Sequence, residues 1–162
     1  MQIKYRLSSL SKGVYMSSSL SASTIAIVKS TGPALRQHGV AITTAMYARL
    51  FQDEEVKAMF DQAAQANGEQ PRRLAAAILG YAENIDKLGA LDGAVARMVA
   101  RHVETGVRPE HYPKVAAALL PAIRETLGEE VATDAVLDAW AEAYGFLANI
   151  LIAKEAAAYE TA

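Results

Sequence analysis

The sequence predicts a single all-α domain, and three observations support this fold class. The chain has 162 residues, which suits one domain, and it is 52% hydrophobic and 21% charged, as is ordinary for a globular protein. Alanine, the best helix former, is abundant, and clusters of β-branched residues are sparse. Beyond residue 24, apolar side chains recur every three or four positions, which is the spacing of amphipathic helices.

Composition also excludes several classes of protein. The chain has no cysteine, so it has no disulfide framework, thiolate metal site or cysteine nucleophile. A net charge of −2 argues against a nucleic-acid partner, which would require a basic face. The unbroken apolar runs are short, so we expect no membrane insertion and a cytoplasmic location.

We expect residues 1–20 to form a flexible N-terminal extension and residues 21–162 to form the domain. Residues 1–15 carry three basic side chains and no acidic one, and they lack the apolar core of a signal peptide. The favoured interpretation is an upstream extension before a start at Met16. A targeting or partner-binding arm is the alternative.

The first two helices are expected on either side of Gly39. Ser23 or Thr24 caps the first, which is kinked or interrupted at the Gly-Pro pair of residues 32–33 and ends at Gly39. The second covers residues 40–52, with apolar side chains near helical spacing.

The middle of the chain is predicted to alternate between helix and loop. Asp53 caps a short helix that ends at Phe60, and the unpatterned residues 61–69 are expected to be a surface loop. Pro71 fits the first turn of a helix that runs to about Leu88.

Three helices are expected in the remainder of the chain. Asp92 caps the first, which stops at Gly106. The second ends at Leu127 and is kinked by Pro121. Thr133 caps the last and longest helix, whose apolar stripe indicates one buried face.

Few residues offer chemistry, and the three histidines differ in their surroundings. His38 is expected to be a surface cation at a helix end, and His111 is expected to be exposed. His102 follows Met98 by one turn, on an apolar side. Spacing alone favours a structural role for His102 over a ligand role. A protein-only zinc site, a nucleophile elbow and a phosphate loop are all missing from the sequence, so the remaining chemistry is a single axial histidine, which suggests haem.

Residues 24–160 resemble the bacterial single-domain haemoglobins of the Vitreoscilla type and the globin domain of flavohaemoglobins. The resemblance rests on six segments in the family's order: HGVAITTAMYARLF (38–51), MFD (59–61), GEQPRRLA (68–75), ARHVETGV (100–107), EHYPKV (110–115) and LDAWAEAYG (137–145). It implies the globin fold, a three-over-three helical sandwich around a haem pocket, and non-covalently bound haem b.

The resemblance also implies roles for individual residues. His102 matches the proximal histidine that binds the iron, and Phe60 matches the phenylalanine that wedges the haem. Tyr47 and Gln70 match the distal tyrosine and glutamine, with Leu74 one turn further along on the ligand side.

Tyr112 and Glu155 match the pair that hydrogen-bonds the far nitrogen of the proximal histidine. Without the resemblance, Glu155 would be interpreted as an exposed carboxylate next to Lys154. Arg101 either pairs with a haem propionate or is a solvated surface side chain. Further haem contacts are expected from Met98, Val107 and Val115, and packing, in part against the porphyrin, from Leu119, Trp140, Leu147 and Ile150.

On the distal side, we expect Tyr47 to be the dominant donor to bound O₂. The Tyr47 phenol can stabilise partial negative charge on that ligand within an apolar pocket. Pro71 fixes the start of its helix, so the Gln70 amide is expected to turn away from the iron.

Two functions follow from the resemblance. The first is reversible O₂ binding for storage, delivery or sensing. The second is NO dioxygenation. Because no reductase sequence follows Ala162, we expect either an external flavin reductase or that the chain is an excised domain. The expected partners are therefore O₂, CO and NO, that reductase, and a second copy of the chain in a homodimer. A haem-free globin-like module is disfavoured by His102.

Overall fold

The computed structural model describes residues 20–161, and every regular element within them is a helix. In chain order the elements are α2 (Ala22–Ser30), α3 (Gly32–Leu50), α4 (Glu54–Lys57), α5 (Gln62–Ala66), α6 (Glu69–Glu83), the 3₁₀ helix η1 (Leu88–Leu91), α7 (Asp92–Thr105), α8 (His111–Leu127) and α9 (Asp134–Thr161). The all-α prediction is confirmed for these residues. The extension expected at residues 1–20 lies outside them, except for Leu20, which packs against the core.

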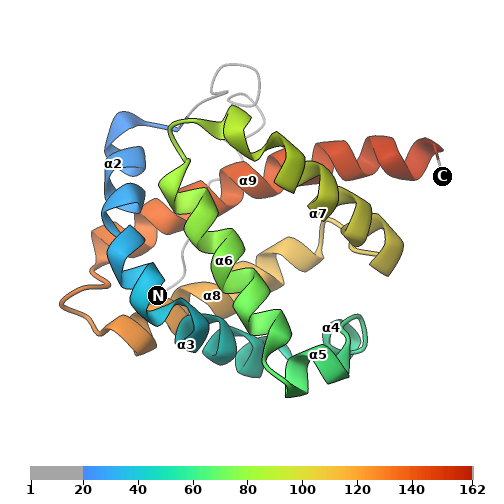
Figure 1. Ribbon diagram of the computed structural model, residues 1–162, viewed down its shortest axis with the longest axis horizontal. Coiled ribbons are helices and arrows are strands. Elements are labelled where there is room, and N and C mark those ends of the chain that lie inside the picture. The colour runs from blue at the N-terminus through green and yellow to red at the C-terminus, as the bar shows by residue number, and fades with distance from the viewer. Residues whose placement is uncertain (1–19, 162) are drawn as a thin grey trace.

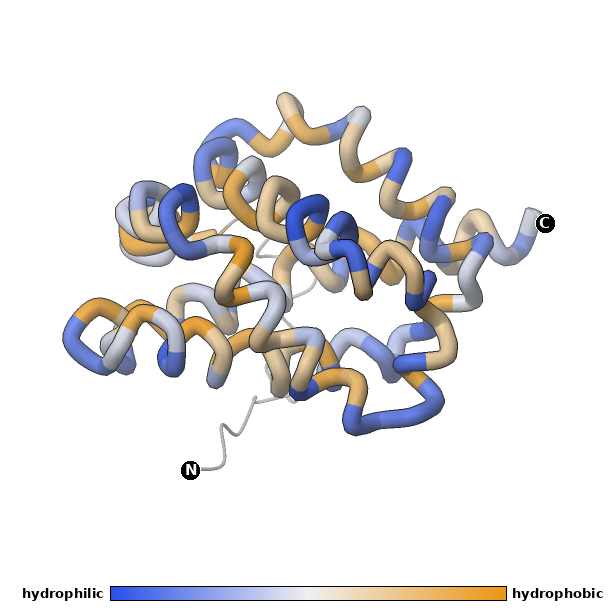
Figure 2. Tube along the Cα trace, turned by 60° about the horizontal axis from the view of Figure 1, so that its bottom comes forward, coloured by the Kyte–Doolittle hydropathy of each residue, from blue (hydrophilic) through white to orange (hydrophobic). Residues whose placement is uncertain are grey.

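The helices pack across one another around a shared interior. Helix α3 packs against α6 and α8, and α9 packs against α2, α7 and α8. Figure 1 shows α6 crossing in front of α8 and α9, with α7 beside the C-terminal half of α9. Figure 2 shows hydrophobic and hydrophilic positions alternating along the helices, as expected when each helix buries one face.

The expected helix break at Gly39 is wrong, because Gly39 lies buried inside α3. A Cβ atom at this position would lie 3.3 Å from the Cβ atom of Ala75 in α6. The missing side chain therefore allows α3 and α6 to approach closely rather than ending the helix. The preceding helix starts earlier than expected, since Ser21 caps it by accepting a hydrogen bond from the backbone N–H of Thr24.

The short helix after α3 is capped as predicted, but the expected loop at residues 61–69 contains a helix. Asp53 caps α4 by accepting from the N–H of Val56, and α4 ends at Lys57, before Phe60. Asp61 then caps α5, because its carboxylate accepts from two backbone N–H groups. The polar sequence hid this helix, which has one buried residue, Ala64.

Other helix ends differ by a few residues from the expected positions. Helix α6 ends at Glu83 rather than near Leu88. The side-chain amide of the next residue, Asn84, donates to the carbonyl of Gly80 and so competes with continuation of the helix. Asp92 is the first residue of α7 rather than its cap. Gly106 ends α7 with a left-handed φ of 81°, as its position predicts. Helix α8 continues through Pro121.

Helix α9 is long and apolar enough, by length and composition, to cross a membrane, which the short apolar runs did not lead us to expect. A core helix meets the same criterion. Helix α9 packs against three other helices, and Trp140, Ala143 and Leu151 on it are buried. The hydroxyl of Thr133 accepts from the N–H of Val136, which confirms the predicted cap of α9.

Candidate functional site

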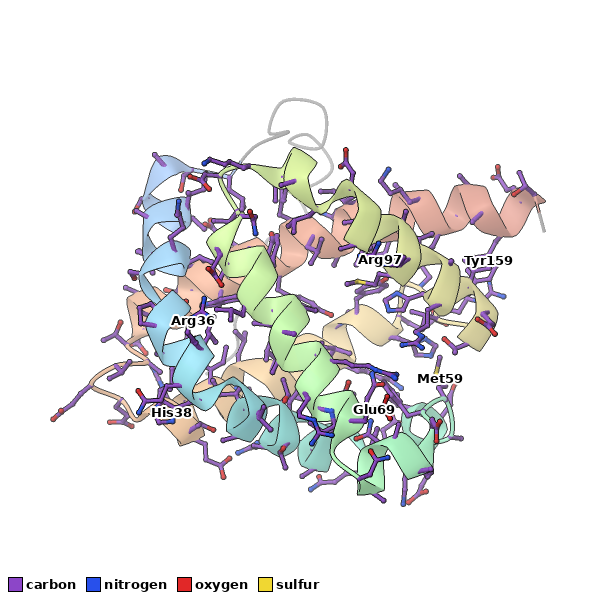
Figure 3. The ribbon with its side chains drawn as sticks, viewed as in Figure 1. Arg36, His38, Met59, Glu69, Arg97 and Tyr159 are labelled. Carbon is purple, nitrogen blue, oxygen red and sulfur yellow. The ribbon has the colours of Figure 1, made fainter. Side chains whose placement is uncertain are left out.

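A large cavity lies between α3, α6, α7, α8 and α9. Its volume is about 730 Å³, within the range of cofactor and ligand pockets. Its walls are mostly apolar, and a few polar side chains converge on it. Met59 follows α4 and Arg97 lies on α7, so these two cavity residues, both labelled in Figure 3, come from different elements.

His102 lines this cavity and is held from behind by two buried side chains. The Glu155 carboxylate Oε1 lies 2.7 Å from His102 Nδ1, and the Tyr112 hydroxyl lies 3.0 Å from the same nitrogen. Tyr112 also donates to both carboxylate oxygens, the Oε2 contact being 2.7 Å long. Glu155 is 3% exposed, so its charge depends on these two donors.

This arrangement fixes the protonation pattern of the His102 ring. An ionised carboxylate only accepts hydrogen bonds, so Nδ1 carries the proton that it receives. The lone pair of a neutral imidazole is then on Nε2, and no hydrogen bond among the described residues uses that atom. Burial and the neighbouring Glu155 charge raise the pKa of the Tyr112 phenol, which keeps Tyr112 a donor.

The ends of α7 and α9 are joined, and this keeps Glu155 in place behind the histidine. The hydroxyl of Tyr159, one turn beyond Glu155, donates to the carbonyl of Val107 at 2.7 Å. The Arg108 guanidinium lies over the Tyr159 ring, 4.2 Å from its centroid. Figure 3 shows Tyr159 on the C-terminal part of α9, beside α7.

On another wall of the cavity, Tyr47 and Gln70 are hydrogen-bonded to each other. The Gln70 Nε2 atom donates to the Tyr47 hydroxyl oxygen at 3.2 Å. Burial raises the pKa of the Tyr47 phenol, although the amides of Gln70 and Gln65 act in the opposite direction. The ring of Phe60 meets the Tyr47 ring edge-on, with 5.4 Å between the centroids, and limits how Tyr47 can move.

The exposed charged side chains that line the cavity are three arginines and Glu104. Arg73, Arg97 and Arg101 line the cavity and are exposed at the residue level, and Arg73 forms an ion pair with Glu69. His111 also lines the cavity and is half-buried, which corrects the expectation that it is exposed. A group with an apolar body and carboxylates at its edge would find apolar walls for its body and arginines for its carboxylates.

The candidate residues named from the sequence come together in the structure. The cavity is lined by Tyr47, Phe60, Gln70, Leu74, Met98, Arg101, His102, Val107, Tyr112, Val115, Leu119, Trp140 and Leu147. Glu155 lies directly behind the cavity wall and is buried, not exposed. Ile150 is half-buried and does not line it, and His38 is an exposed residue within α3 rather than at a helix end.

Sequence reasoning missed several cavity residues. Ile78 and Leu151 fall on apolar stripes, and such spacing indicates a buried face without distinguishing a cavity wall from the core. Arg73 and Arg97 had no distinguishing sequence signal, because isolated arginines on amphipathic helices are common.

The chain is similar to several known proteins. A family model described as Globin matches residues 43–151. A flavohemoprotein of Xylella fastidiosa is 53% identical over 141 residues, which are 87% of this chain and 35% of that relative. A flavohemoprotein of Pseudomonas aeruginosa is 48% identical over 135 residues, or 83% of this chain and 34% of the relative. The chain therefore spans about a third of the length of these curated relatives.

Solved structures give the same result, and two of them are matched over nearly their whole length. A bacterial globin from Campylobacter jejuni is 40% identical with a TM-score of 0.80, covering 86% of this chain and 99% of that one. An engineered carbene transferase, a candidate nitric oxide dioxygenase from Rhodothermus marinus, is 42% identical with a TM-score of 0.82, covering 88% and 98%. A flavohemoglobin from Malassezia yamatoensis with bound FAD and heme is 29% identical with a TM-score of 0.79, covering 87% and 38%.

Proposed function

The chain belongs to the globin family and takes haem as its cofactor, and from this premise we propose that it binds O₂ reversibly. Haem iron supplies, when bound, an open coordination position for a small diatomic ligand. The observation that carries the proposal is the polar pair Tyr47 and Gln70 on the wall of an otherwise apolar cavity that His102 also lines.

His102 is the residue that we assign to the iron. Its Nδ1 proton is held by Glu155, so the free lone pair on Nε2 is the available ligand atom. The carboxylate draws the ring toward imidazolate character and makes it a stronger electron donor. Tyr112 fixes the orientation of the carboxylate by donating to it.

The cavity walls would hold the rest of the cofactor. We assign the apolar contacts to Phe60, Leu74, Met98, Val107 and Val115, which line the cavity. The exposed arginines that line it match the charge of the haem propionates, and among them Arg101 is adjacent in sequence to the iron ligand.

Tyr47 is the donor that we assign to O₂. Its raised pKa keeps the phenol protonated, and an O–H group in an apolar cavity stabilises negative charge that develops on the ligand. The Gln70 amide already donates to the phenol oxygen, so its role is to support Tyr47.

NO dioxygenation is the second candidate function. It is favoured by the Glu155–Tyr112 pair behind His102, which increases electron donation, and by similarity to a candidate nitric oxide dioxygenase. In this reaction NO, O₂ and one electron give nitrate. We propose that a flavin reductase supplies the electron, since several relatives are flavohemoproteins.

One experiment separates the two functions. Reversible O₂ binding predicts a ferrous spectrum that changes with O₂ and returns under argon through repeated cycles. Dioxygenation predicts that added NO is consumed once per haem without a reductase, and over many turnovers when a flavin reductase and NADH are present. No turnover with fast re-reduction would leave O₂ binding as the function, and an irreversible O₂ response would contradict it.

A further inference from the structure

Helix α5 holds a buried amide nitrogen without a partner. Among the described residues, the Nε2 atom of Gln65 is the buried side-chain polar atom that completes no hydrogen bond. A buried donor left unpaired costs about 1–3 kcal/mol, so such an atom is informative. The backbone around it is well fixed, since Gln65 N–H donates to the Asp61 carbonyl and its own carbonyl accepts from Gly68 N–H, both at 3.1 Å.

Gln65 lines a second space that Tyr47 also lines, and it is not among the residues that line the main cavity. A surface groove of about 340 Å³ is lined by both residues together with Thr44, Ala48, Phe51, Gln62, Ala66 and Pro71. Tyr47 lines this groove and also the large cavity, so it separates the two spaces. Figure 1 shows α5 next to the N-terminal end of α6, the helix that carries Gln70.

The hydrogen-bonding capacity of the Tyr47 hydroxyl matches this arrangement. A phenol oxygen donates one hydrogen bond and also accepts. One acceptor position is used by Gln70 Nε2 at 3.2 Å. Gln65 lines the same groove as Tyr47, and its side chain acts to lower the pKa of the Tyr47 phenol, as a hydrogen-bond donor to the phenol oxygen does.

We propose that Gln65 is a positioning residue for Tyr47, and that its buried Nε2 donates to the phenol oxygen alongside Gln70 so that the phenol proton is directed into the large cavity. This inference rests on the proposed function, because Gln65 would affect how strongly Tyr47 donates to O₂ bound in that cavity. Gln65 does not touch the ligand; it acts through the hydroxyl of Tyr47.

The proposal explains why an amide suits this position. When the amide nitrogens of Gln65 and Gln70 both donate to the phenol oxygen, neither can accept the hydroxyl proton. That proton then points to the ligand in the large cavity. A carboxylate at residue 65 would instead accept the phenol proton and turn it toward the groove. The charge at one position on α5 therefore decides which space receives the Tyr47 proton.

The test compares Gln65→Glu, which is nearly isosteric, with Gln65→Leu, which removes the donor without adding charge. We expect O₂ dissociation about tenfold faster in the first variant and about threefold faster in the second. We also expect a higher C–O stretching frequency in the ferrous CO complex, because a donor near the ligand lowers this frequency. Gln37→Glu, an exposed change on α3, is the matched control.

The decisive arm repeats these changes in a Tyr47→Phe background. Because Gln65 acts through the hydroxyl, neither substitution should change O₂ dissociation there. Equal effects on O₂ dissociation in the wild-type and Tyr47→Phe backgrounds would overturn the positioning role. The same conclusion would follow if Tyr47→Phe changed the rate and Gln65→Glu did not. An unchanged rate in Tyr47→Phe itself would instead contradict the donor role that the proposed function assigns to Tyr47. Thermal unfolding of each haem-loaded protein separates a loss of stability from these effects.

Discussion

The Glu155 carboxylate lies 2.7 Å from Nδ1 of His102, although 53 residues separate them in the chain. The contact joins α7 to the C-terminal part of α9, and the hydroxyl of Tyr112 from α8 completes it. Three helices thus meet at one imidazole. If His102 binds the iron as we propose, its strength as a ligand is set by groups that no local pattern around it reveals.

Glu155→Gln should weaken electron donation by His102 while preserving shape. We expect a lower iron–histidine stretching frequency and an iron reduction potential raised by about 60 mV, the one-electron equivalent of a tenfold change. Resonance Raman spectroscopy and potentiometry measure these quantities. Glu160→Gln, an exposed change on α9, is the control. An unchanged stretching frequency in Glu155→Gln would show that the carboxylate does not act on the bound histidine.

His102→Ala should remove the axial ligand. We expect the variant, expressed with ample haem, to retain little pigment and to lose the normal ferrous CO spectrum. Absorption spectra of the purified protein measure both effects. His111→Ala, at the other histidine on the cavity wall, should leave the axial ligation unchanged. If His102→Ala kept an unaltered spectrum, His111 would become the next candidate.

Tyr47→Phe should release O₂ about tenfold to a hundredfold faster, since one hydrogen bond to a partly charged ligand is lost. CO dissociation should change little, because bound CO is less polar. Stopped-flow ligand replacement measures both rates. We expect a smaller effect from Gln70→Leu, whose amide contacts the phenol oxygen. The ranking of the two residues would be reversed if only Gln70→Leu accelerated O₂ release.

Two helical glycines should respond differently to alanine. Gly80 in α6 has nothing within 4 Å of an added Cβ, so Gly80→Ala should raise the free energy of unfolding by up to about 1 kcal/mol. At Gly39 the same gain is opposed because an added Cβ would lie 3.3 Å from the Cβ atom of Ala75. The free energy of unfolding of Gly39→Ala should therefore rise by about 1 kcal/mol less than that of Gly80→Ala. Urea unfolding of both variants compares the values. Equal stabilisation would mean that α3 and α6 do not pack closely at this point.

Where the physical cause is local, the sequence was a good guide to the structure. Asp53 and Thr133 cap helices because a side-chain oxygen reaches a backbone N–H three residues ahead. Gly106 ends α7 because its left-handed backbone conformation suits glycine. The apolar spacing predicted helices for the same reason, since a buried face repeats with the turn of the helix.

Local patterns failed where a distant segment decided the outcome. A glycine can end a helix or allow two helices to pack closely, and at Gly39 only the position of Ala75 distinguishes the two. Helix α5 was hidden because its polar sequence carries almost no apolar stripe, while an Asp61 cap holds it.

The sequence by itself determined the all-helical fold, the caps at Asp53 and Thr133 and, through the resemblance, which residues to examine. Only the tertiary structure decided that Glu155 is buried behind His102 and that Gln65 and Tyr47 line the same groove. The physical reason is that burial and hydrogen-bond pairing depend on which helices meet. Helical periodicity fixes the buried face of each helix but leaves its partner undetermined.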